Sequence, residues 1–147
     1  MSTNANYAEI AKEYIKKYYE LYDVDNIEQR VAGLNNLYKD PHSFMSFEGQ
    51  AALGRAAISE LLLKQDITKI ERWILDIQSQ PLLYGSVLAV VRGMIKTDEN
   101  PPKSYSHVLI FRPNDDGSFY VGHEIYKLFR WLDFEFLIIQ NFRFAFL

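Results

Sequence analysis

Residues 104–129 read SYSHVLIFRPNDDGSFYVGHEIYKLF, and this stretch decides the fold class. Two apolar, β-prone runs, Ser104 to Arg112 and Ser118 to Phe129, flank the polar loop Pro113 to Gly117. Asp-Gly within that loop is the strongest hairpin signal in the chain, because glycine adopts the positive φ that tight turns need. The sequence therefore predicts a long antiparallel hairpin.

Two further strands are predicted upstream of this hairpin. Ile70 to Ser79 has alternating character, and Pro81 to Gly85 reads as the turn that follows it. Ser86 to Lys96 is rich in valine and apolar on both faces for most of its length, which is typical of a central strand. The charged segment Thr97 to Pro102 contains two prolines and predicts a stiff turn.

The first half of the chain has helical periodicity instead. Between residues 7 and 22 the apolar residues fall on one helical face and the charged residues on the other. Asp25 followed by Glu28 resembles a capping box and predicts the start of a second helix. The remaining expected elements are the end of that helix at Asp40-Pro41, a short extended piece from Ser43 to Glu48, and a third helix from Arg55 to Lys64.

Helices followed by long antiparallel strands predict an α+β fold. We expect a cone-shaped domain, with three helices packed in the concave face of a bent, mostly antiparallel sheet. The polar N-terminus lacks the features of a secretory signal peptide, and Trp131 to Leu147 is too short and too interrupted for a membrane span. We therefore expect a soluble, intracellular protein without membrane insertion.

Composition excludes several functional classes. The 147 residues carry a formal charge of −3, which argues against nucleic-acid binding, and they include no cysteine and only three histidines. No phosphate-binding glycine loop and no metalloprotease motif is present, so neither a cofactor nor a metal is expected. Phe, Tyr and Trp together supply 22 residues, and so many rings need a core, a pocket or an interface.

Few side chains suggest chemistry. His107 or Asp76 could act as an acid or base in a cavity, but neither has an identifiable partner, and pairing with structural neighbours is the simpler interpretation. Glu48 ends the short extended piece just before Gly49, and Asp98 and Glu99 lie in the loop between two predicted strands, where acids are usually just solvated. The alternative is a negative rim around an apolar cavity, which would steer a basic partner.

Several motifs together resemble the nuclear transport factor 2 family. They include Ser46 to Gly49, Asp76 to Pro81, Asp98 to Pro101 and Phe119 to Leu128, and the resemblance runs from about residue 7 to residue 129. It implies a non-enzymatic carrier that binds the GDP form of the small GTPase Ran and the Phe-Gly repeats of nucleoporins. It also implies a homodimer formed through the sheet, in the cytoplasm and nucleus and concentrated at the nuclear pore.

The resemblance also assigns candidate site residues. Glu48 matches the family's rim glutamate, Phe47 the aromatic beside it, and Asp98 a loop aspartate. Asn100 stands where a second acid is common, and Glu99 is the residue that could compensate for it. These five residues are the expected Ran-binding set. Tyr7 matches a tryptophan of the first helix that helps to bind nucleoporin phenylalanines.

The chain departs from the family pattern at three places. Residues 26–33 include extra positions between the first two helices, and His123-Glu124 replaces an Asn-Asp pair. The expected domain spans residues 1–130, and residues 131–147 form an apolar extension of unknown role that we expect to pack on its own chain or its dimer mate. Two alternative functions stay open: an mRNA-export cofactor of the same fold that pairs with a larger receptor, and a dehydratase- or isomerase-type cavity enzyme.

Overall fold

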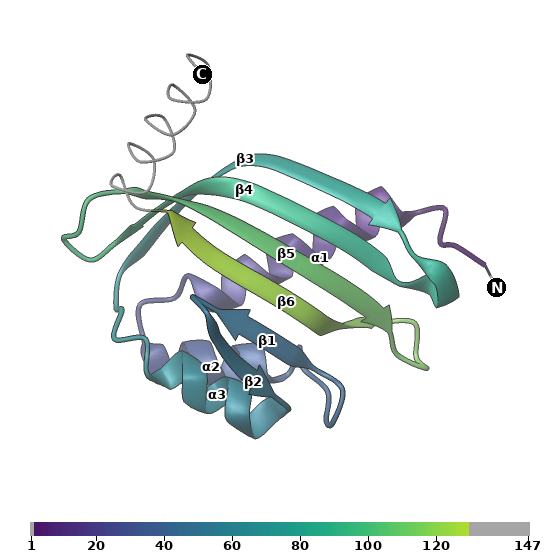
Figure 1. Ribbon diagram of the computed structural model, residues 1–147, viewed down its shortest axis with the longest axis horizontal. Helices are drawn as coiled ribbons and strands as arrows, with labels where there is room; N and C mark the ends of the chain where they lie inside the picture. Colours follow the sequence, from purple (N-terminus) through teal and green to yellow (C-terminus); the bar gives the residue numbers. More distant parts are fainter. Residues whose placement is uncertain (1, 130–147) are drawn as a thin grey trace, which may run out of the picture.

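The computed structural model describes residues 2–129, so the predicted extension from residue 131 to 147 lies outside the described residues. Helices come first and long strands follow, as the sequence predicts (Figure 1). In chain order the elements are α1 (Tyr7–Tyr22), α2 (Ile27–Asn35), β1 (Phe44–Phe47), β2 (Gln50–Leu53), α3 (Arg55–Leu63), β3 (Ile70–Pro81), a 3₁₀ turn η1 (Leu83–Gly85), β4 (Val87–Thr97), β5 (Lys103–Pro113) and β6 (Phe119–Phe129).

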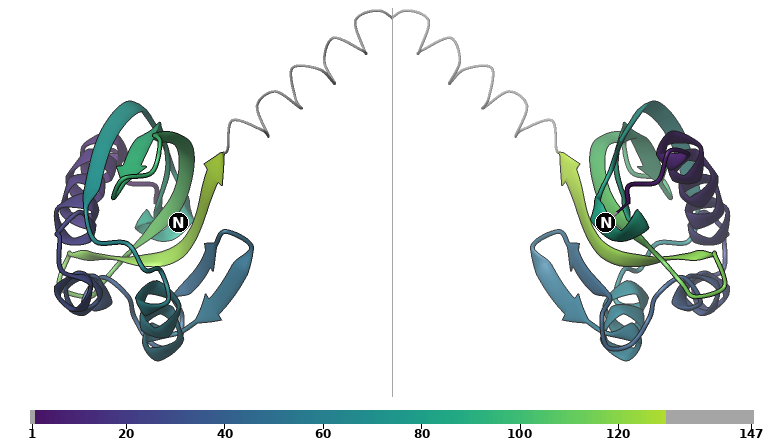
Figure 2. Two further views of the ribbon diagram at one scale, coloured as in Figure 1. Left: turned by 90° about the vertical axis from the view of Figure 1, so that its left-hand side faces the viewer. Right: turned by 90° about the vertical axis from the view of Figure 1, so that its right-hand side faces the viewer.

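The strands form one six-stranded sheet in the order β2-β1-β6-β5-β4-β3. Every neighbouring pair is antiparallel except β1 and β6, which are parallel. Seen end-on, the sheet curves around α1, and α2 and α3 lie below it beside β1 and β2 (Figure 2). The predicted α+β fold, with helices in the concavity of a bent and mostly antiparallel sheet, is confirmed.

Helix α1 fills the concavity because one of its faces is aromatic and apolar. The buried residues of that face recur at helical spacing, and the Tyr14 hydroxyl accepts a hydrogen bond of 3.0 Å from the backbone N–H of Phe119. The Tyr14 ring contacts Phe111 and Phe119 at centroid distances of 5.7 and 5.3 Å. The predicted apolar face of this helix therefore packs against the sheet through Tyr14, and many of the rings belong to this core.

Two local details differ from the sequence prediction. Helix α2 is capped by Asn26, whose side chain accepts a 2.8 Å hydrogen bond from Gln29 N–H, and not by Asp25. The helix ends at Asn35, well before Pro41, because a short turn follows it. Strand β2 was not predicted at all, since its four residues are too few to show a period.

Strand β3 is an edge strand with an irregular middle. Its register with β4 shifts between Ile74 and Asp76, so Leu75 is an extra residue and forms a β-bulge. Gly93 of β4 lies beside this bulge, where a Cβ atom would approach the Trp73 carbonyl oxygen to 2.2 Å and the Tyr105 ring to 2.7 Å. Glycine at 93 is therefore what allows the Tyr105 ring and the Trp73 carbonyl group to approach β4 so closely.

Candidate functional site

Glu48 occupies the tight turn between β1 and β2. Glu48 and Gly49 both have positive φ, +49° and +80°, which is the pattern of a type I′ hairpin turn. The Glu48 N–H donates to the Tyr126 carbonyl oxygen at 3.0 Å, and the Glu48 carboxylate accepts from the Leu128 N–H. The ammonium group of Lys127 lies 3.9 Å from the same carboxylate. Glu48 therefore holds the turn against β6 through two hydrogen bonds, while its side chain remains partly exposed.

Asp98 orders the loop between β4 and β5. Its N–H donates to the Lys69 carbonyl oxygen at 2.9 Å, and its carboxylate accepts from the N–H groups of Lys69 and Thr68, at 2.8 and 3.3 Å. These backbone hydrogen bonds lower the pKa of Asp98 below its ordinary value. Asp98 thus shapes the loop, which leaves Glu99 and Asn100 as its exposed polar side chains.

A buried arginine supports this loop from behind, and sequence reasoning did not find it. The Arg30 guanidinium donates to four backbone carbonyl oxygens at 2.6–2.9 Å. Thr68 is one of these acceptors and also donates to Asp98, so α2 and the loop share one network. The four acceptors belong to Tyr22, Val24, Ile67 and Thr68.

The Glu48 turn and the Asp98 loop lie at the same end of the sheet, the left-hand end in Figure 1. The strand pairing agrees with this placement. Phe47, just before the Glu48 turn, pairs with Tyr126 near the end of β6, and Thr97, just before the Asp98 loop, pairs with Ile70 at the start of β3. Because successive strands from β6 to β3 are antiparallel, the end of β6 and the start of β3 lie at the same end of the sheet. Phe47 is 4% exposed, and its ring stacks on Tyr126 at 5.0 Å. Among the five expected Ran-binding residues, Phe47 therefore supports the site from the core.

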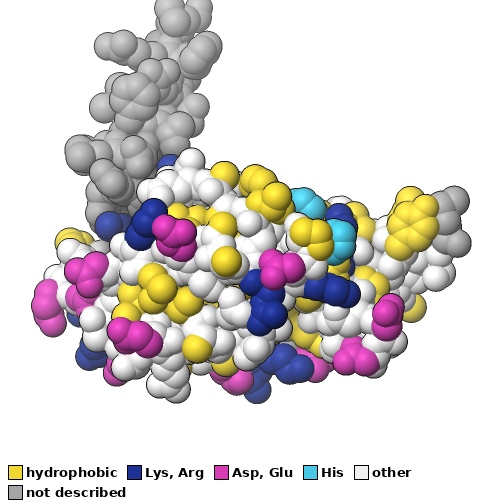
Figure 3. Space-filling model, turned by 90° about the horizontal axis from the view of Figure 1, so that it is seen from below, with side chains coloured by type: hydrophobic (Ala, Val, Ile, Leu, Met, Phe, Trp, Pro, Cys, Tyr) yellow, Lys and Arg dark blue, Asp and Glu magenta, His cyan; other side chains and the backbone are white. Residues whose placement is uncertain are grey.

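The charge at this end is mixed. The Lys127 ammonium lies 3.9 Å from the Glu48 carboxylate, and the Lys69 ammonium lies 3.8 Å from the carboxylate of Glu71, the second residue of β3. Figure 3 shows basic and acidic side chains close together at the same end of the molecule. A surface with both signs of charge fixes the orientation of a partner more than it adds affinity.

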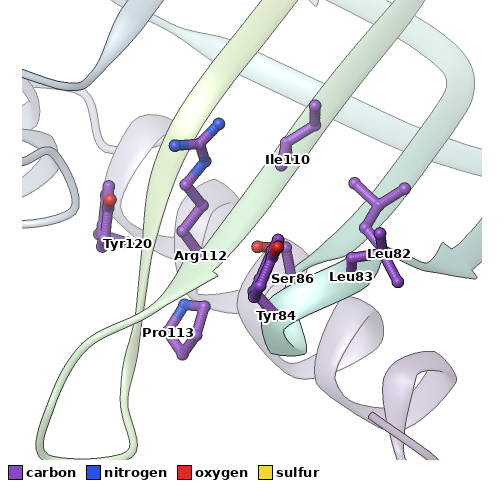
Figure 4. A pocket seen from close by; sticks show the side chains of 8 residues that line it. All are labelled: Leu82, Leu83, Tyr84, Ser86, Ile110, Arg112, Pro113 and Tyr120. Carbon is purple, nitrogen blue, oxygen red and sulfur yellow. The ribbon is translucent and has the colours of Figure 1, made fainter. Parts of the chain in front are cut away.

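Tyr7 lies at the opposite end, where α1 begins (Figure 1). A groove of about 550 Å³ is found at this end, with Leu83, Tyr84 and Pro113 among the side chains that line it (Figure 4). The segment before Tyr7 touches the groove's η1 turn, because the Gly85 N–H donates to the Ser2 carbonyl oxygen at 3.3 Å. The two predicted binding regions are thus separated by the length of α1.

A buried polar network occupies the interior between these ends. Glu124 accepts hydrogen bonds from Tyr18 at 2.9 Å and from Tyr38, and lies 2.7 Å from the Nε2 atom of His107. The Tyr19 hydroxyl lies 3.0 Å from the Nδ1 atom of His107. The sequence analysis found no partner for His107; the structure corrects this, and the partner is Glu124 on the next strand.

Burial determines the protonation of this network. Desolvation lowers the pKa of His107 despite the opposing effect of Glu124, and raises the pKa of Tyr18 and Tyr38 well above the ordinary value. We therefore assign a neutral His107 that donates from Nε2 to Glu124 and accepts at Nδ1 from Tyr19. Exposures of 0% for His107 and 2% for Glu124 leave no room for a substrate.

Other candidate chemistry is not assembled in the described residues. Asp76 is exposed and lies opposite Arg92 in the register of β3 with β4, on the outer face of the sheet, so it does not meet the buried His107. Within residues 2–129 no group of three or more His, Asp or Glu side chains could hold a metal ion. In the same range, no helix is long and apolar enough to cross a membrane.

Comparison with known proteins identifies the family. Residues 10–128 match the nuclear transport factor 2 domain. A probable nuclear transport factor 2 of Caenorhabditis elegans is 44% identical over 128 residues, covering 87% of this chain and 96% of the relative. For nuclear transport factor 2 of Emericella nidulans the identity is 30% over 126 residues, with coverages of 84% and 96%.

A solved structure supports the same assignment at the level of the fold. Nuclear transport factor 2 from Cryptosporidium parvum superimposes with a TM-score of 0.80 at 22% identity, covering 88% of this chain and 99% of that one. The chain therefore belongs to the nuclear transport factor 2 family, whose members are transport factors and not enzymes.

Proposed function

We propose that this chain carries Ran in its GDP form through the nuclear pore and shuttles between cytoplasm and nucleus. Family membership over nearly the whole domain supports the proposal. The observation that carries it to particular residues is the common location of the Glu48 turn and the loop from Asp98 to Asn100 at one end of the sheet.

In this proposal Ran binds across that end. Glu48 and Glu99 supply the charges that meet basic side chains of Ran, and Asn100 contributes hydrogen bonds. Asp98 keeps the loop in place, because its carboxylate is already occupied by the N–H groups of Thr68 and Lys69. Phe47 lies in the core beneath this surface and supports the Glu48 turn by stacking on Tyr126.

Nucleoporin phenylalanines bind at the other end, near Tyr7, in the same proposal. Tyr7 is part-buried against the core, and the apolar groove beside η1 lies at the same end of the molecule. Separate ends allow the carrier to hold Ran and a nucleoporin repeat together, as transport through the pore requires.

The outer face of the sheet is the proposed homodimer interface. Phe44 and Ile125 are exposed large apolar side chains there, and they lie on neighbouring strands β1 and β6. Exposed apolar patches of this kind mark interaction surfaces. A stable homodimer favours the Ran carrier over the export cofactor, which pairs with a foreign receptor.

Titration of Ran-GDP into the purified full-length protein tests the site. Glu99→Lys should weaken binding at least tenfold, because it reverses an exposed charge that makes no described contact with its own chain, and each tenfold is about 1.4 kcal/mol. Glu48→Gln keeps an acceptor for the Leu128 N–H while removing the charge, so a weaker but measurable loss is expected. Tyr7→Ala should leave Ran binding intact and weaken binding to a Phe-Gly peptide. Unchanged Ran binding in both acid variants would show that the partner binds elsewhere.

A further inference from the structure

Strand β3 carries three consecutive exposed apolar residues at its bulge. Trp73 and Leu75, which we call the edge patch, have exposures of 46% and 70%, whereas Ile74 between them faces α1, beside Ile15 and Tyr19. Strand β3 is also an edge of the sheet, and its 12 residues make an unusually long one. Long apolar edges promote aggregation unless something covers them. The edge patch therefore requires a partner.

We propose that residues 131–147 of the same chain cover the edge patch. The register shows why this segment is well placed. Phe129 pairs with Ser104, Ser104 with Met94, and Met94 with Trp73, so these four residues form one row across the sheet. The described chain thus ends in the same row as the patch, three strands away.

The segment is long enough to reach the patch in any regular conformation. Three strand spacings amount to about 14 Å. Seventeen residues span about 26 Å at the helical rise per residue, and more than that if extended. A tethered segment also has an effective concentration of about millimolar, so even weak apolar contacts are populated.

The composition of the segment matches the surface. Its apolar residues include six aromatics, at Trp131, Phe134, Phe136, Phe142, Phe144 and Phe146. Left in solvent, so apolar a run would itself be an aggregation hazard, and covering the patch removes both exposed surfaces together.

Charge complementarity favours the same occupant. Arg92 and Lys96 of β4 flank Met94 on the outer side, opposite Asp76 and Glu71 in the register with β3, but neither comes close enough to these acids or to another described residue to form an ion pair. The segment's two acids, Asp133 and Glu135, follow within six residues of Phe129. These acids therefore have basic partners along the path from β6 to β3. The proposal adds a function for the extension and leaves the Phe44 and Ile125 side of the sheet available to a second copy.

Engineered disulfides in the full-length chain test this placement, and the absence of native cysteines gives a clean background. Leu75→Cys combined with Phe136→Cys should form an intrachain disulfide on mild oxidation, seen as a monomer band that migrates faster than the reduced chain on a non-reducing gel and has lost both free thiols in a thiol assay. The matched control combines Leu53→Cys with Phe136→Cys, because Leu53 is also exposed but lies on β2 at the far edge. An interchain disulfide, no disulfide, or equal yields in the two pairs would overturn the proposal.

Fluorescence gives a second readout, because Trp73 and Trp131 are the only tryptophans. In a Trp131→Phe background, acrylamide quenching reports on Trp73 alone. Replacing Phe134, Phe136 and Leu137 by serine should raise the quenching constant roughly twofold, since an uncovered indole gains contact with solvent. Leu53→Ser in the same background should leave it unchanged. Identical quenching with and without the three serines would contradict the proposal, even if the protein still binds Ran.

Discussion

Replacing Glu124 by leucine should destabilise the protein strongly, although the volume of the side chain changes little. The substitution removes the acceptor of Tyr18, Tyr38 and His107, all of which are buried. The two tyrosine hydroxyls lie 3.3 Å apart and can still pair with each other. One tyrosine O–H and the His107 N–H are then left without partners.

The magnitude follows from these two unpaired donors. Each buried, unsatisfied group costs about 1–3 kcal/mol, so the expected loss in free energy of unfolding is about 4 kcal/mol. Removing a buried carboxylate relieves part of its desolvation cost, but breaking one side of a buried pair still costs about 3–5 kcal/mol in other proteins. For a chain of this size about 4 kcal/mol corresponds to a fall in Tm of roughly 8–16 °C.

Denaturant unfolding at fixed protein concentration measures this loss. Tyr38→Phe is the matched single deletion and should cost only about 1–2 kcal/mol, since Glu124 keeps two other donors. The double variant should cost less than the sum of the singles, because the tyrosine has no acceptor left to lose. If the free energy of unfolding of the Glu124→Leu protein were within about 1 kcal/mol of the wild-type value, the hydrogen bonds of Glu124 would not stabilise the fold to the extent expected.

Three other predictions follow from the contacts described. The pKa of His107 is lowered in the folded state by burial, so below about pH 6.5 the unfolded chain binds a proton that the folded chain does not, and stability should fall by up to about 1.4 kcal/mol per pH unit. Denaturant unfolding between about pH 5 and pH 8 should show this slope, and His107→Gln should flatten it. Arg30→Met should lower the free energy of unfolding by about 2–4 kcal/mol, because it leaves four carbonyl oxygens without their hydrogen-bond donor. Hydrogen exchange should accelerate at the backbone amides of Thr68 and Lys69. Gly93→Ala should lower stability by about 1–3 kcal/mol in a thermal melt, since its Cβ collides with the Trp73 carbonyl group.

Local periodicity made the long elements predictable. Helix α1 has its predicted bounds, and the four long strands appear within a few residues of their expected ends, because 10 or more residues give several repeats of each period. Strand β2 has four residues, and its turn uses Glu-Gly in place of the commoner Asn-Gly. Such a short hairpin has too little pattern to be seen.

The buried polar network depends on the pairing of distant strands, so the sequence alone could not predict it. His107 and Glu124 meet only because the β5–β6 hairpin places them diagonally on one face, and a single shift in pairing would separate them. Arginine is seldom fully buried, and no local pattern in the sequence marks Arg30, yet it is 2% exposed and four carbonyl acceptors satisfy its guanidinium group. The loop position of Asp98, Glu99 and Asn100 was expected, whereas Glu48 was predicted to end an extended piece and instead lies in a turn, and the backbone contacts that hold Glu48 and Asp98 were not predicted.

The proposed carrier function is tested most directly by its dependence on the nucleotide. The full-length protein is titrated into Ran loaded with GDP and, in parallel, into Ran loaded with a non-hydrolysable GTP analogue. We predict saturable binding to the GDP form and at least tenfold weaker binding to the GTP form. Equal affinity for both forms, or binding to neither, would contradict the assignment of this chain as a Ran-GDP carrier.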